Sequence, residues 1–183
     1  MARLILLNGP PASGKSTLAR RWAAARPLSL VLDIDVVRSL LGAWSATPDD
    51  AGLAARALAV AMARTHLRAG HDVIVPQFLA RDEFVTELET LADDEGARFV
   101  ELALITTVDD TLAAFAARTD AAAEVEHRDA AFLVERAGGA TALAAMHARY
   151  TALIDTRPAA VRIGVARGDV EASLARVTAA IER

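Results

Sequence analysis

The sequence Gly9-Pro10-Pro11-Ala12-Ser13-Gly14-Lys15-Ser16 decides the fold of this chain. Its spacing, G-x-x-x-x-G-K-[ST], is that of the P-loop, whose backbone N–H groups surround phosphate oxygens while the lysine reaches between them. An apolar run at 4–7 precedes the motif, and a helix-forming stretch at 17–24 follows it. The motif therefore stands between a buried strand and a helix, which is the setting that phosphate binding requires.

The basic residues of the chain support this interpretation. Lys15 is the only lysine, and every other basic residue is arginine. A compact ammonium fits between phosphate oxygens, whereas the flat, forked guanidinium of arginine does not. A chain that uses arginine elsewhere and keeps lysine here therefore favours a phosphate ligand over a turn without one.

The expected ligands of this loop are the phosphates of a nucleoside triphosphate and Mg²⁺. Backbone N–H groups of residues 10–16 would surround the β-phosphate, and Lys15 would bridge the β- and γ-phosphates. The Ser16 hydroxyl would bind Mg²⁺, and Thr17 would lie toward the α-phosphate or the helix. The predicted nucleotide contacts in the loop are Gly9, Pro11, Ala12, Ser13, Gly14, Lys15, Ser16 and Thr17.

Length and composition narrow the function classes. The 183 residues suit one domain spanning 1–183, and a hydrophobic fraction of 54% is ample for a core. A net charge of −4 gives no broad basic surface, so neither nucleic acid nor an anionic membrane is expected as a partner. The absence of cysteine excludes disulfides and thiolate chemistry, and no apolar stretch reaches transmembrane length. We therefore expect a cytoplasmic protein that holds phosphate through local arginines and backbone N–H groups.

Apolar runs alternate with helix-forming segments along the whole chain. Predicted strands lie at 4–7, 28–32, 72–76, 98–105 and 160–165. Predicted helices lie at 17–24, 35–41, 48–68, 82–92, 107–119, 140–154 and 170–181. This alternation predicts an α/β fold, with helices on both faces of a five-stranded parallel sheet in a three-layer α/β/α arrangement. Ligands of such folds bind at the carboxyl ends of the strands, so the residues that follow each strand matter most.

The second predicted strand is followed by Asp33-Ile34-Asp35-Val36-Val37-Arg38. Two carboxylates at this place would face the γ-phosphate, where one can accept the proton of an attacking hydroxyl and the other can orient a water on Mg²⁺. We expect Asp35 to be the general base and Asp33 to support the metal. Arg38 follows Asp35 by one helical turn and is expected to hold the acceptor or the transferring group. The alternative is that both acids only cap the short helix.

The P-loop together with D-x-D-x-x-R after the second strand resembles the P-loop small-molecule kinases. The most similar patterns are those of the chloramphenicol phosphotransferase-like and polynucleotide-kinase-like proteins, grouped as AAA_33-type ATPases; adenylylsulfate kinase and zeta toxins are more distant. The layout matches along the whole chain, but the specific motifs lie within 4–42. The resemblance implies a P-loop NTPase fold of the nucleoside-kinase-like type and ATP-dependent transfer of a phosphoryl group to a hydroxyl of a small molecule. It also implies that Asp35 is the catalytic base and that Arg38 contacts the substrate.

The end of the third predicted strand departs from this pattern. The relatives usually carry an aspartate there, often with Thr-Asn, whereas this chain has Pro76-Gln77. Gln77 can hydrogen-bond to a substrate but is a weak partner for Mg²⁺. We therefore expect Asp33 and Ser16, rather than a residue after the third strand, to support Mg²⁺. Arg81, which follows, either reaches the acceptor site or lies beside the start of the next helix.

The resemblance also implies a small mobile lid, which we place at about 119–137. Arginines of such lids close over the nucleotide and exclude water, which would otherwise take the phosphoryl group. Arg118 and Arg128 match these arginines in position and type, and Arg136 is a further candidate. After the last strand, Arg167 and Gly168 would lie against the adenine base.

Three other functions remain open, and one of them is a toxin-type kinase that acts on a nucleotide sugar. An end kinase for nucleotides or nucleic acid would need a basic channel or stacking aromatics. The net charge of −4 and the aromatic content of 4% argue against this function. A regulatory P-loop ATPase would hydrolyse ATP without a phosphorylated product. The acceptor, the choice between ATP and GTP and the oligomeric state are also open. Trp44 and the helix at 48–68, with Arg56 and Arg64, are candidates for the wall of the acceptor pocket.

Overall fold

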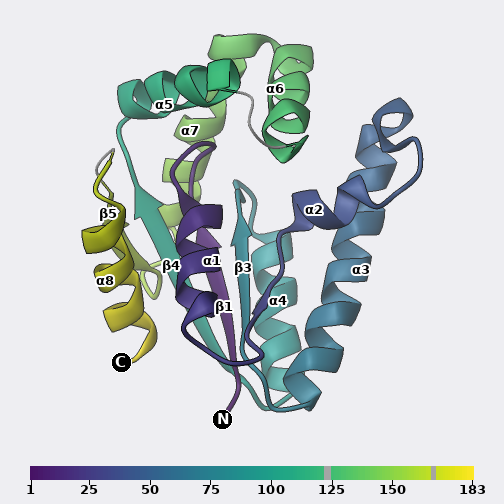
Figure 1. Cartoon of the computed structure of the whole chain (residues 1–183), viewed down its shortest axis with the longest axis vertical. Helices are drawn as coiled ribbons and strands as arrows, with labels where there is room; N and C mark the ends of the chain where they lie inside the picture. The colour runs from purple at the N-terminus through teal and green to yellow at the C-terminus, as the bar shows by residue number, and fades with distance from the viewer. Residues whose placement is uncertain (122–124, 166–167) are drawn as a thin grey trace.

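The centre of the molecule is a five-stranded sheet in which all pairings are parallel (Figure 1). The structure, a computed structural model, describes residues 1–121, 125–165 and 168–183, and of residues 120, 121 and 125–128 it describes the backbone only. The strands are β1 (Arg3–Asn8), β2 (Leu30–Val31), β3 (Val73–Gln77), β4 (Arg98–Ile105) and β5 (Val161–Gly164). Their order is β2-β3-β1-β4-β5, so β1 lies in the middle. The predicted α/β fold with five parallel strands is confirmed.

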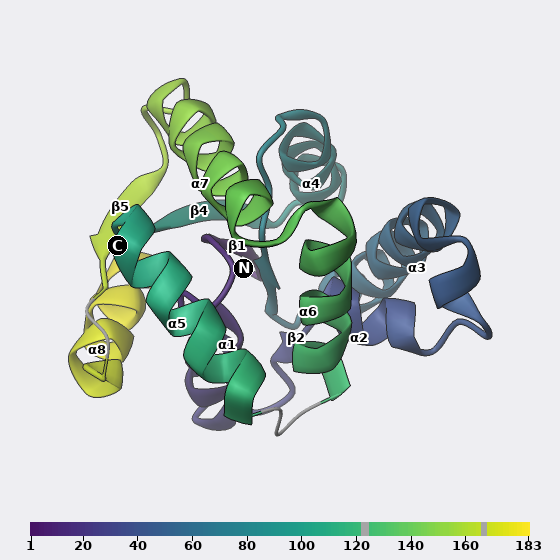
Figure 2. The ribbon, with the colours of Figure 1, turned by 90° about the horizontal axis from the view of Figure 1, so that it is seen from above.

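Helices cover both faces of the sheet, in the predicted three-layer arrangement (Figure 2). The helices are α1 (Lys15–Ala24), α2 (Ile34–Ser39), α3 (Pro48–Arg68), α4 (Glu83–Asp94), α5 (Val108–Ala121), α6 (Val125–Ala137), α7 (Gly139–Asp155) and α8 (Val170–Ile181), with a 3-10 turn at Trp44–Ala46. Helices α1 and α8 lie on one face, and α3, α4 and α7 lie on the other. Among the described helices, none is long and apolar enough to cross a bilayer.

Strand β1 explains the three layers. Leu4 and Leu6 pack in a core cluster with α3 and α4, whereas Ile5 and Leu7 pack in a second cluster with α1 and α8. All four side chains are fully buried. Because successive side chains of a strand point to opposite faces, a strand that is apolar at every position is stable only when both faces are covered.

The carboxyl ends of the central strands meet at one edge of the sheet. Asn8, the last residue of β1, lies beside Gln77 of β3 and Ala103 of β4. The buried Asn8 side chain donates through Nδ2 to the Leu79 carbonyl (3.2 Å) and accepts from the Leu79 N–H (2.9 Å). This pair of hydrogen bonds attaches the loop after β3 to the base of the P-loop.

Strand β2 is shorter than predicted. The apolar run at 28–32 predicts five residues, but the strand comprises only Leu30–Val31. Leu28 is exposed and has a left-handed backbone (φ 60°), because the turn that leaves α1 extends to this residue. The chain then leaves the sheet at Asp33, which begins α2. Despite its length, β2 brings Asp33 and Asp35 to the carboxyl edge of the sheet.

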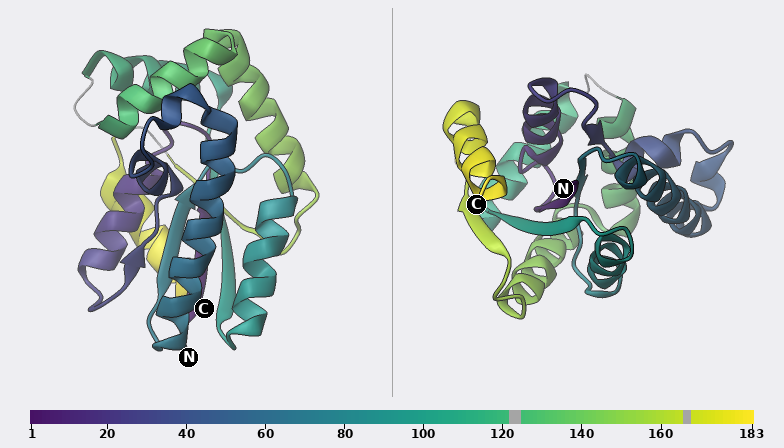
Figure 3. Two further views of the ribbon diagram at one scale, coloured as in Figure 1. Left: turned by 90° about the vertical axis from the view of Figure 1, so that its right-hand side faces the viewer. Right: turned by 90° about the horizontal axis from the view of Figure 1, so that it is seen from below.

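Helices α5, α6 and the start of α7 lie above this edge (Figures 1 and 3). They share a small apolar cluster around Phe115, Val134 and Leu143. Helix α6 was not predicted, because the charged residues at 120–129 conceal the apolar positions that follow them. The expected lid at about 119–137 coincides with the end of α5 and with α6, and its movement stays a prediction.

Arg157, which follows α7, connects its own loop to strand β4 and helix α4. Its Nε donates to both carboxylate oxygens of Glu101 on β4 (2.8 Å each). Its two terminal nitrogens donate to Asp82 and to Glu89 of α4 (2.6 Å each). Burial raises the pKa of Glu101, an effect that the hydrogen bond and charge of Arg157 oppose. Glu101 therefore depends on Arg157 to remain charged inside the protein.

We predict that Arg157→Met lowers the free energy of unfolding at pH 7 by about 3–5 kcal/mol, because it leaves a buried carboxylate without its partner. Without Arg157 the folded-state pKa of Glu101 rises further above the unfolded value. The loss of stability is then greatest at pH above that raised pKa and shrinks as pH falls and Glu101 takes up a proton. Urea unfolding of both proteins between pH 5 and 8 measures this dependence.

Arg162→Met is the matched control. Arg162 pairs with Asp155 at 3.1 Å, but both side chains are at least half exposed, so its loss is expected to cost less than about 1 kcal/mol. Equal costs for the two variants, or a cost at Arg157 that does not change with pH, would contradict the role assigned to Glu101.

Candidate active site

The P-loop connects the end of β1 to the start of α1. Ala12 (φ 61°) and Gly14 (φ 85°) both have left-handed backbones, and Gly14 is the residue that precedes α1. No side chain caps the start of α1, so its first N–H groups stay available to a ligand. A loop of this shape followed by a helix N-terminus attracts anions.

Gly9 is required because the loop approaches the sheet closely. A Cβ at this position would lie 2.6 Å from the Ser13 hydroxyl oxygen and 3.1 Å from the Leu104 Cβ on β4. The second distance is set by a buried side chain that has little room to move. The first glycine of the motif therefore allows the loop to pack on β4, and the second, Gly14, allows the left-handed turn.

The Lys15 side chain folds back over the loop. Its Nζ donates a hydrogen bond to the Pro10 carbonyl (3.1 Å). Burial, followed by the nearby positive charge of Arg118, lowers the pKa of Lys15 to about 8, and the carboxylates of Asp35 and Asp33 oppose this. An anion bound in the loop would favour the charged form of the amine.

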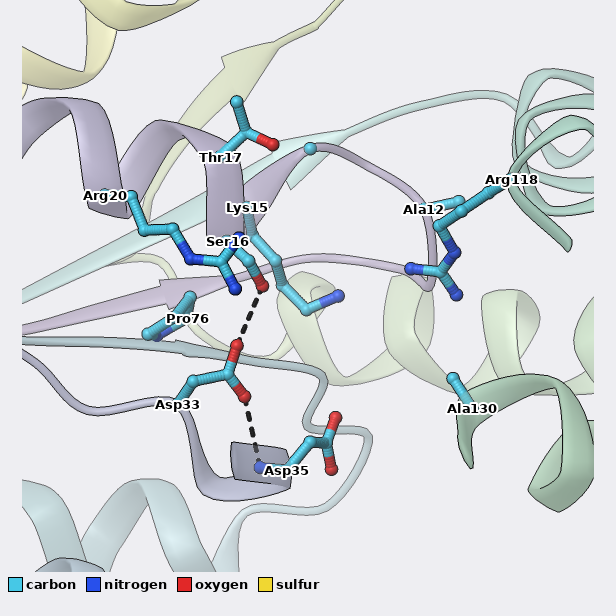
Figure 4. A pocket seen from close by; sticks show the side chains of 11 residues that line it. Ala12, Lys15, Ser16, Thr17, Arg20, Asp33, Asp35, Pro76, Arg118 and Ala130 are labelled. Atoms are coloured by element: carbon cyan, nitrogen blue, oxygen red, sulfur yellow. Dashed lines mark hydrogen bonds between the residues drawn. The ribbon is translucent and has the colours of Figure 1, made fainter. Parts of the chain in front are cut away.

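Asp33 and Asp35 lie opposite the loop (Figure 4). One Asp33 oxygen accepts from the Ser16 hydroxyl (2.9 Å) and the other accepts from the Asp35 N–H (3.1 Å). Burial raises the pKa of Asp33, the charge of Asp35 adds to the effect, and the hydrogen bond from Ser16 opposes it. Asp33 does cap α2, as the alternative interpretation held, but the same carboxylate also contacts the P-loop serine.

These groups line a cavity of about 230 Å³ at the start of α1. Lys15, Ser16, Asp33, Asp35 and Arg118 all face it, so the structure brings together predicted residues from α1, α2 and α5. Arg20, Pro76 and Ala130 line it as well, and none of these was predicted. For Arg20 the signal was present in the sequence, because it follows Ser16 by four residues and so shares its face of α1.

Arg118 reaches the cavity from above. It lies in the last turn of α5, its guanidinium is 5.0 Å from the centre of the Phe115 ring, and it points toward the P-loop (Figure 4). The other two arginines expected over the nucleotide are not placed: the side chain of Arg128 and all of Arg167 lie outside the described residues. Arg136 is exposed near the end of α6 and lines no described cavity.

Arg38 is directed toward Asp35. Its Nη1 donates to the Asp35 carboxylate (2.8 Å), and its guanidinium lies 4.8 Å from the centre of the Trp44 ring. Trp44 in turn meets the edge of Phe132 on α6, with 6.3 Å between ring centres. Arg38 is largely buried in this stack. The arrangement holds Asp35 beside the cavity and forms an aromatic contact between α6 and the turn at Trp44.

The residues present suit Mg²⁺ bound mainly by phosphate and water. Ser16 and Asp33 supply two neighbouring oxygen ligands of the type that Mg²⁺ prefers. Among the described residues there is no group of three or more acidic, histidine or cysteine side chains that could hold a metal alone. Gln77, at the end of β3, has a buried carboxamide oxygen without a hydrogen-bond partner within the described chain, but it is not among the residues that line this cavity. Mg²⁺ keeps several waters in such sites, so two protein oxygens are sufficient.

A smaller cavity of about 150 Å³ lies on the other side of the P-loop, between α1 and α8. Its wall includes Ser13, Thr17, Val165 and Gly168 and is mostly apolar. Thr17 lines both this cavity and the first one, so the two adjoin at the start of α1. A flat, apolar group attached to a phosphate chain fits this arrangement.

Solved structures of other proteins share this fold. They include the protein APE1195 (18% identity, TM-score 0.64, covering 99% of this chain and 95% of that one). They also include the tunicamycin resistance protein of Deinococcus radiodurans (16% identity, TM-score 0.62, covering 99% and 96%). A gluconokinase from Sinorhizobium meliloti is a further example (15% identity, TM-score 0.52, covering 99% and 95%).

At these identities the structural similarity establishes the fold alone. No curated protein matches the sequence. The family model AAA_33, described as an AAA domain, matches residues 4–153, which include the P-loop, both aspartates and Arg118. The resemblance to the P-loop kinases expected from the motifs is therefore confirmed, and the chain belongs to the AAA_33 family.

Proposed function

We propose that this protein is an ATP-dependent phosphotransferase that transfers the γ-phosphate to a hydroxyl group of a small molecule. The observation that carries the proposal is the position of the Asp35 carboxylate, which lines the same cavity as Lys15 and Ser16 of the P-loop. A carboxylate opposite a phosphate-binding loop can accept the proton of an attacking hydroxyl. A protein that only binds or hydrolyses nucleotide does not need a base for an alcohol.

The nucleotide is held by the P-loop in this proposal. The phosphates occupy the cavity at the start of α1, where backbone N–H groups, Lys15 and Ser16 contact them. The base occupies the apolar cavity between α1 and α8, beside Val165 and Gly168. Bound Mg²⁺ would neutralise charge on the β- and γ-phosphate oxygens, and Ser16 and Asp33 are the residues that would hold it.

Asp35 then receives the proton of the acceptor hydroxyl. Its side chain is 39% exposed, and Arg38 contacts one of its two carboxylate oxygens, Oδ1. Arg38 fixes the orientation of the carboxylate, and the Trp44 ring fixes Arg38. In this arrangement Arg38 is a positioning residue for Asp35, which differs from the direct contact with the acceptor expected from the motif.

Two cations flank the path of the phosphoryl group. Arg118 faces the cavity from α5, and Arg20 faces it from α1. Fixed positive groups beside the transferring phosphoryl stabilise the charge that develops on its oxygens. Helices α5 and α6 above the cavity exclude water, which would compete with the acceptor.

We predict that Asp35→Asn slows phosphoryl transfer at least about 100-fold while the affinity for ATP with Mg²⁺ changes little, because asparagine cannot accept the proton. The acceptor is first found by screening hydroxyl compounds for ADP release and a phosphorylated product. Transfer is then measured by product formation and binding by calorimetry. Asp49→Asn, at an exposed position at the start of α3, is the control. Wild-type transfer by the Asp35 variant would exclude Asp35 as the base.

A second prediction concerns proton uptake by Lys15, whose pKa is about 8 in the free protein. Bound phosphate raises that pKa, so ATP binding above pH 8 is accompanied by proton uptake, and the affinity falls as pH rises further. Calorimetry at pH 8.5 in two buffers of different ionisation enthalpy is expected to show uptake of most of a proton.

Lys15→Met provides the control for this measurement. The variant is expected to bind ATP about 10- to 100-fold more weakly and to take up no proton at pH 8.5, since it has no amine to titrate. Equal proton uptake by the variant and the wild type would show that another group is responsible.

A further inference from the structure

Three arginines that make no ion pair with any described residue line one cavity beyond the end of β3. They are Arg56 on α3, Arg81 in the loop after β3 and Arg149 on α7. The cavity has a volume of about 340 Å³, which is the size of a small-molecule site. Helices α3, α4 and α7 lie side by side on this face of the sheet (Figure 3).

Many arginines elsewhere in the described part of the chain pair with carboxylates, whereas the three in this cluster do not. Ion pairs to carboxylates are made by Arg3, Arg21, Arg26, Arg38, Arg64, Arg68, Arg157, Arg162 and Arg176. Within the described part of the chain, no carboxylate lies at ion-pair distance from Arg56, Arg81 or Arg149. Glu83 is the one acidic residue lining the cavity, so the four charged side chains there sum to +2. Gathering like charges costs free energy, which an anionic ligand would offset.

The other residues that line the cavity indicate which chemical groups the rest of the ligand carries. Phe78, Phe84 and Met146 line the cavity, and the guanidinium of Arg56 lies 5.3 Å from the centre of the Phe84 ring. The N-terminus of α4 also opens here, with no side-chain cap on its first N–H groups. Guanidinium groups and helix amides recognise carboxylate or phosphate oxygens, and the aromatic walls suit an apolar or ring-shaped skeleton.

The cavity adjoins the candidate active site. Strand β3 ends between them, since Pro76 lines the phosphate cavity and Phe78 lines the arginine cavity. Leu79, which also lines the arginine cavity, is attached to the base of the P-loop by its two hydrogen bonds with Asn8. These hydrogen bonds therefore connect one wall of the arginine cavity to the base of the P-loop.

We infer that this cavity binds the acceptor through an anionic group, so that the acceptor is a small hydroxyl compound carrying a carboxylate or a phosphate monoester on an apolar or ring skeleton. Naming the ligand as the phosphate acceptor rests on the proposed function. Binding of an anion in this cavity does not depend on ATP. Arg56, Arg81 and Arg149 bind the acidic group, and the hydroxyl points along the end of β3 toward Asp35.

The test measures binding of defined anions to the full-length protein without nucleotide. The probes are 4-(hydroxymethyl)benzoate and phenyl phosphate, and 4-(hydroxymethyl)benzamide is the uncharged analogue; ligand-observed NMR gives their affinities. The acids are expected to bind at least about 10-fold more tightly than the amide. Arg81→Gln and Arg149→Gln are each expected to weaken acid binding about 10-fold, whereas Arg183→Gln, at an exposed terminal position, leaves it unchanged.

Three outcomes would overturn the inference. The first is equal binding, or no binding, of acids and amide. The second is acid binding that neither Arg81→Gln nor Arg149→Gln weakens. The third is acid binding that only Lys15→Met abolishes, which would place the anion on the P-loop. Circular dichroism of the arginine variants confirms that they fold. Because ATP binding and the Asp35 experiment are measured separately, failure here leaves the proposed function standing.

Discussion

The close approach of the P-loop to the sheet is the constraint on which the rest of the structure depends. Gly9 packs where a Cβ would collide with Ser13 and press on Leu104, and Gly14 adopts the left-handed turn that starts α1. The loop can take this shape only if β1 is central and its carboxyl end is level with those of its neighbours. The uniformly apolar β1 requires helices on both faces, and one of these helices, α1, carries Lys15 and Ser16 of the site.

The charges around the phosphate cavity form two opposed groups. Burial, followed by the charge of Arg118, lowers the pKa of Lys15, while burial, followed by the charge of Asp35, raises the pKa of Asp33. A bound polyphosphate would oppose the lowered pKa of Lys15, and a bound divalent cation would oppose the raised pKa of Asp33. The two shifts are therefore consistent with ATP and Mg²⁺ as the ligands of the proposed phosphotransferase.

Arginine serves two separate purposes in this chain. Arg157 is enclosed by Glu101, Asp82 and Glu89 and joins β4 to its neighbouring helices, so its charge is neutralised within the fold. Arg64, which was a candidate for the acceptor pocket, likewise pairs with Glu95 and joins α3 to the end of α4. Arg56 and Arg81 have no such partner among the residues that the structure describes, and they face a cavity. The sequence shows the same residue type in every case, and only the carboxylates nearby distinguish structural arginines from those available to a ligand.

The sequence by itself determined the parts of this protein that depend on local geometry. The P-loop, the five strands and the placement of Asp33 and Asp35 after β2 follow from turn residues and from the periodicity of apolar side chains. Tertiary structure decided which side chains meet across elements: Arg38 turns to Asp35 and Trp44, and α6 forms where charged residues concealed its apolar side. These outcomes depend on the packing of helices that are distant in sequence, and no local pattern encodes that packing.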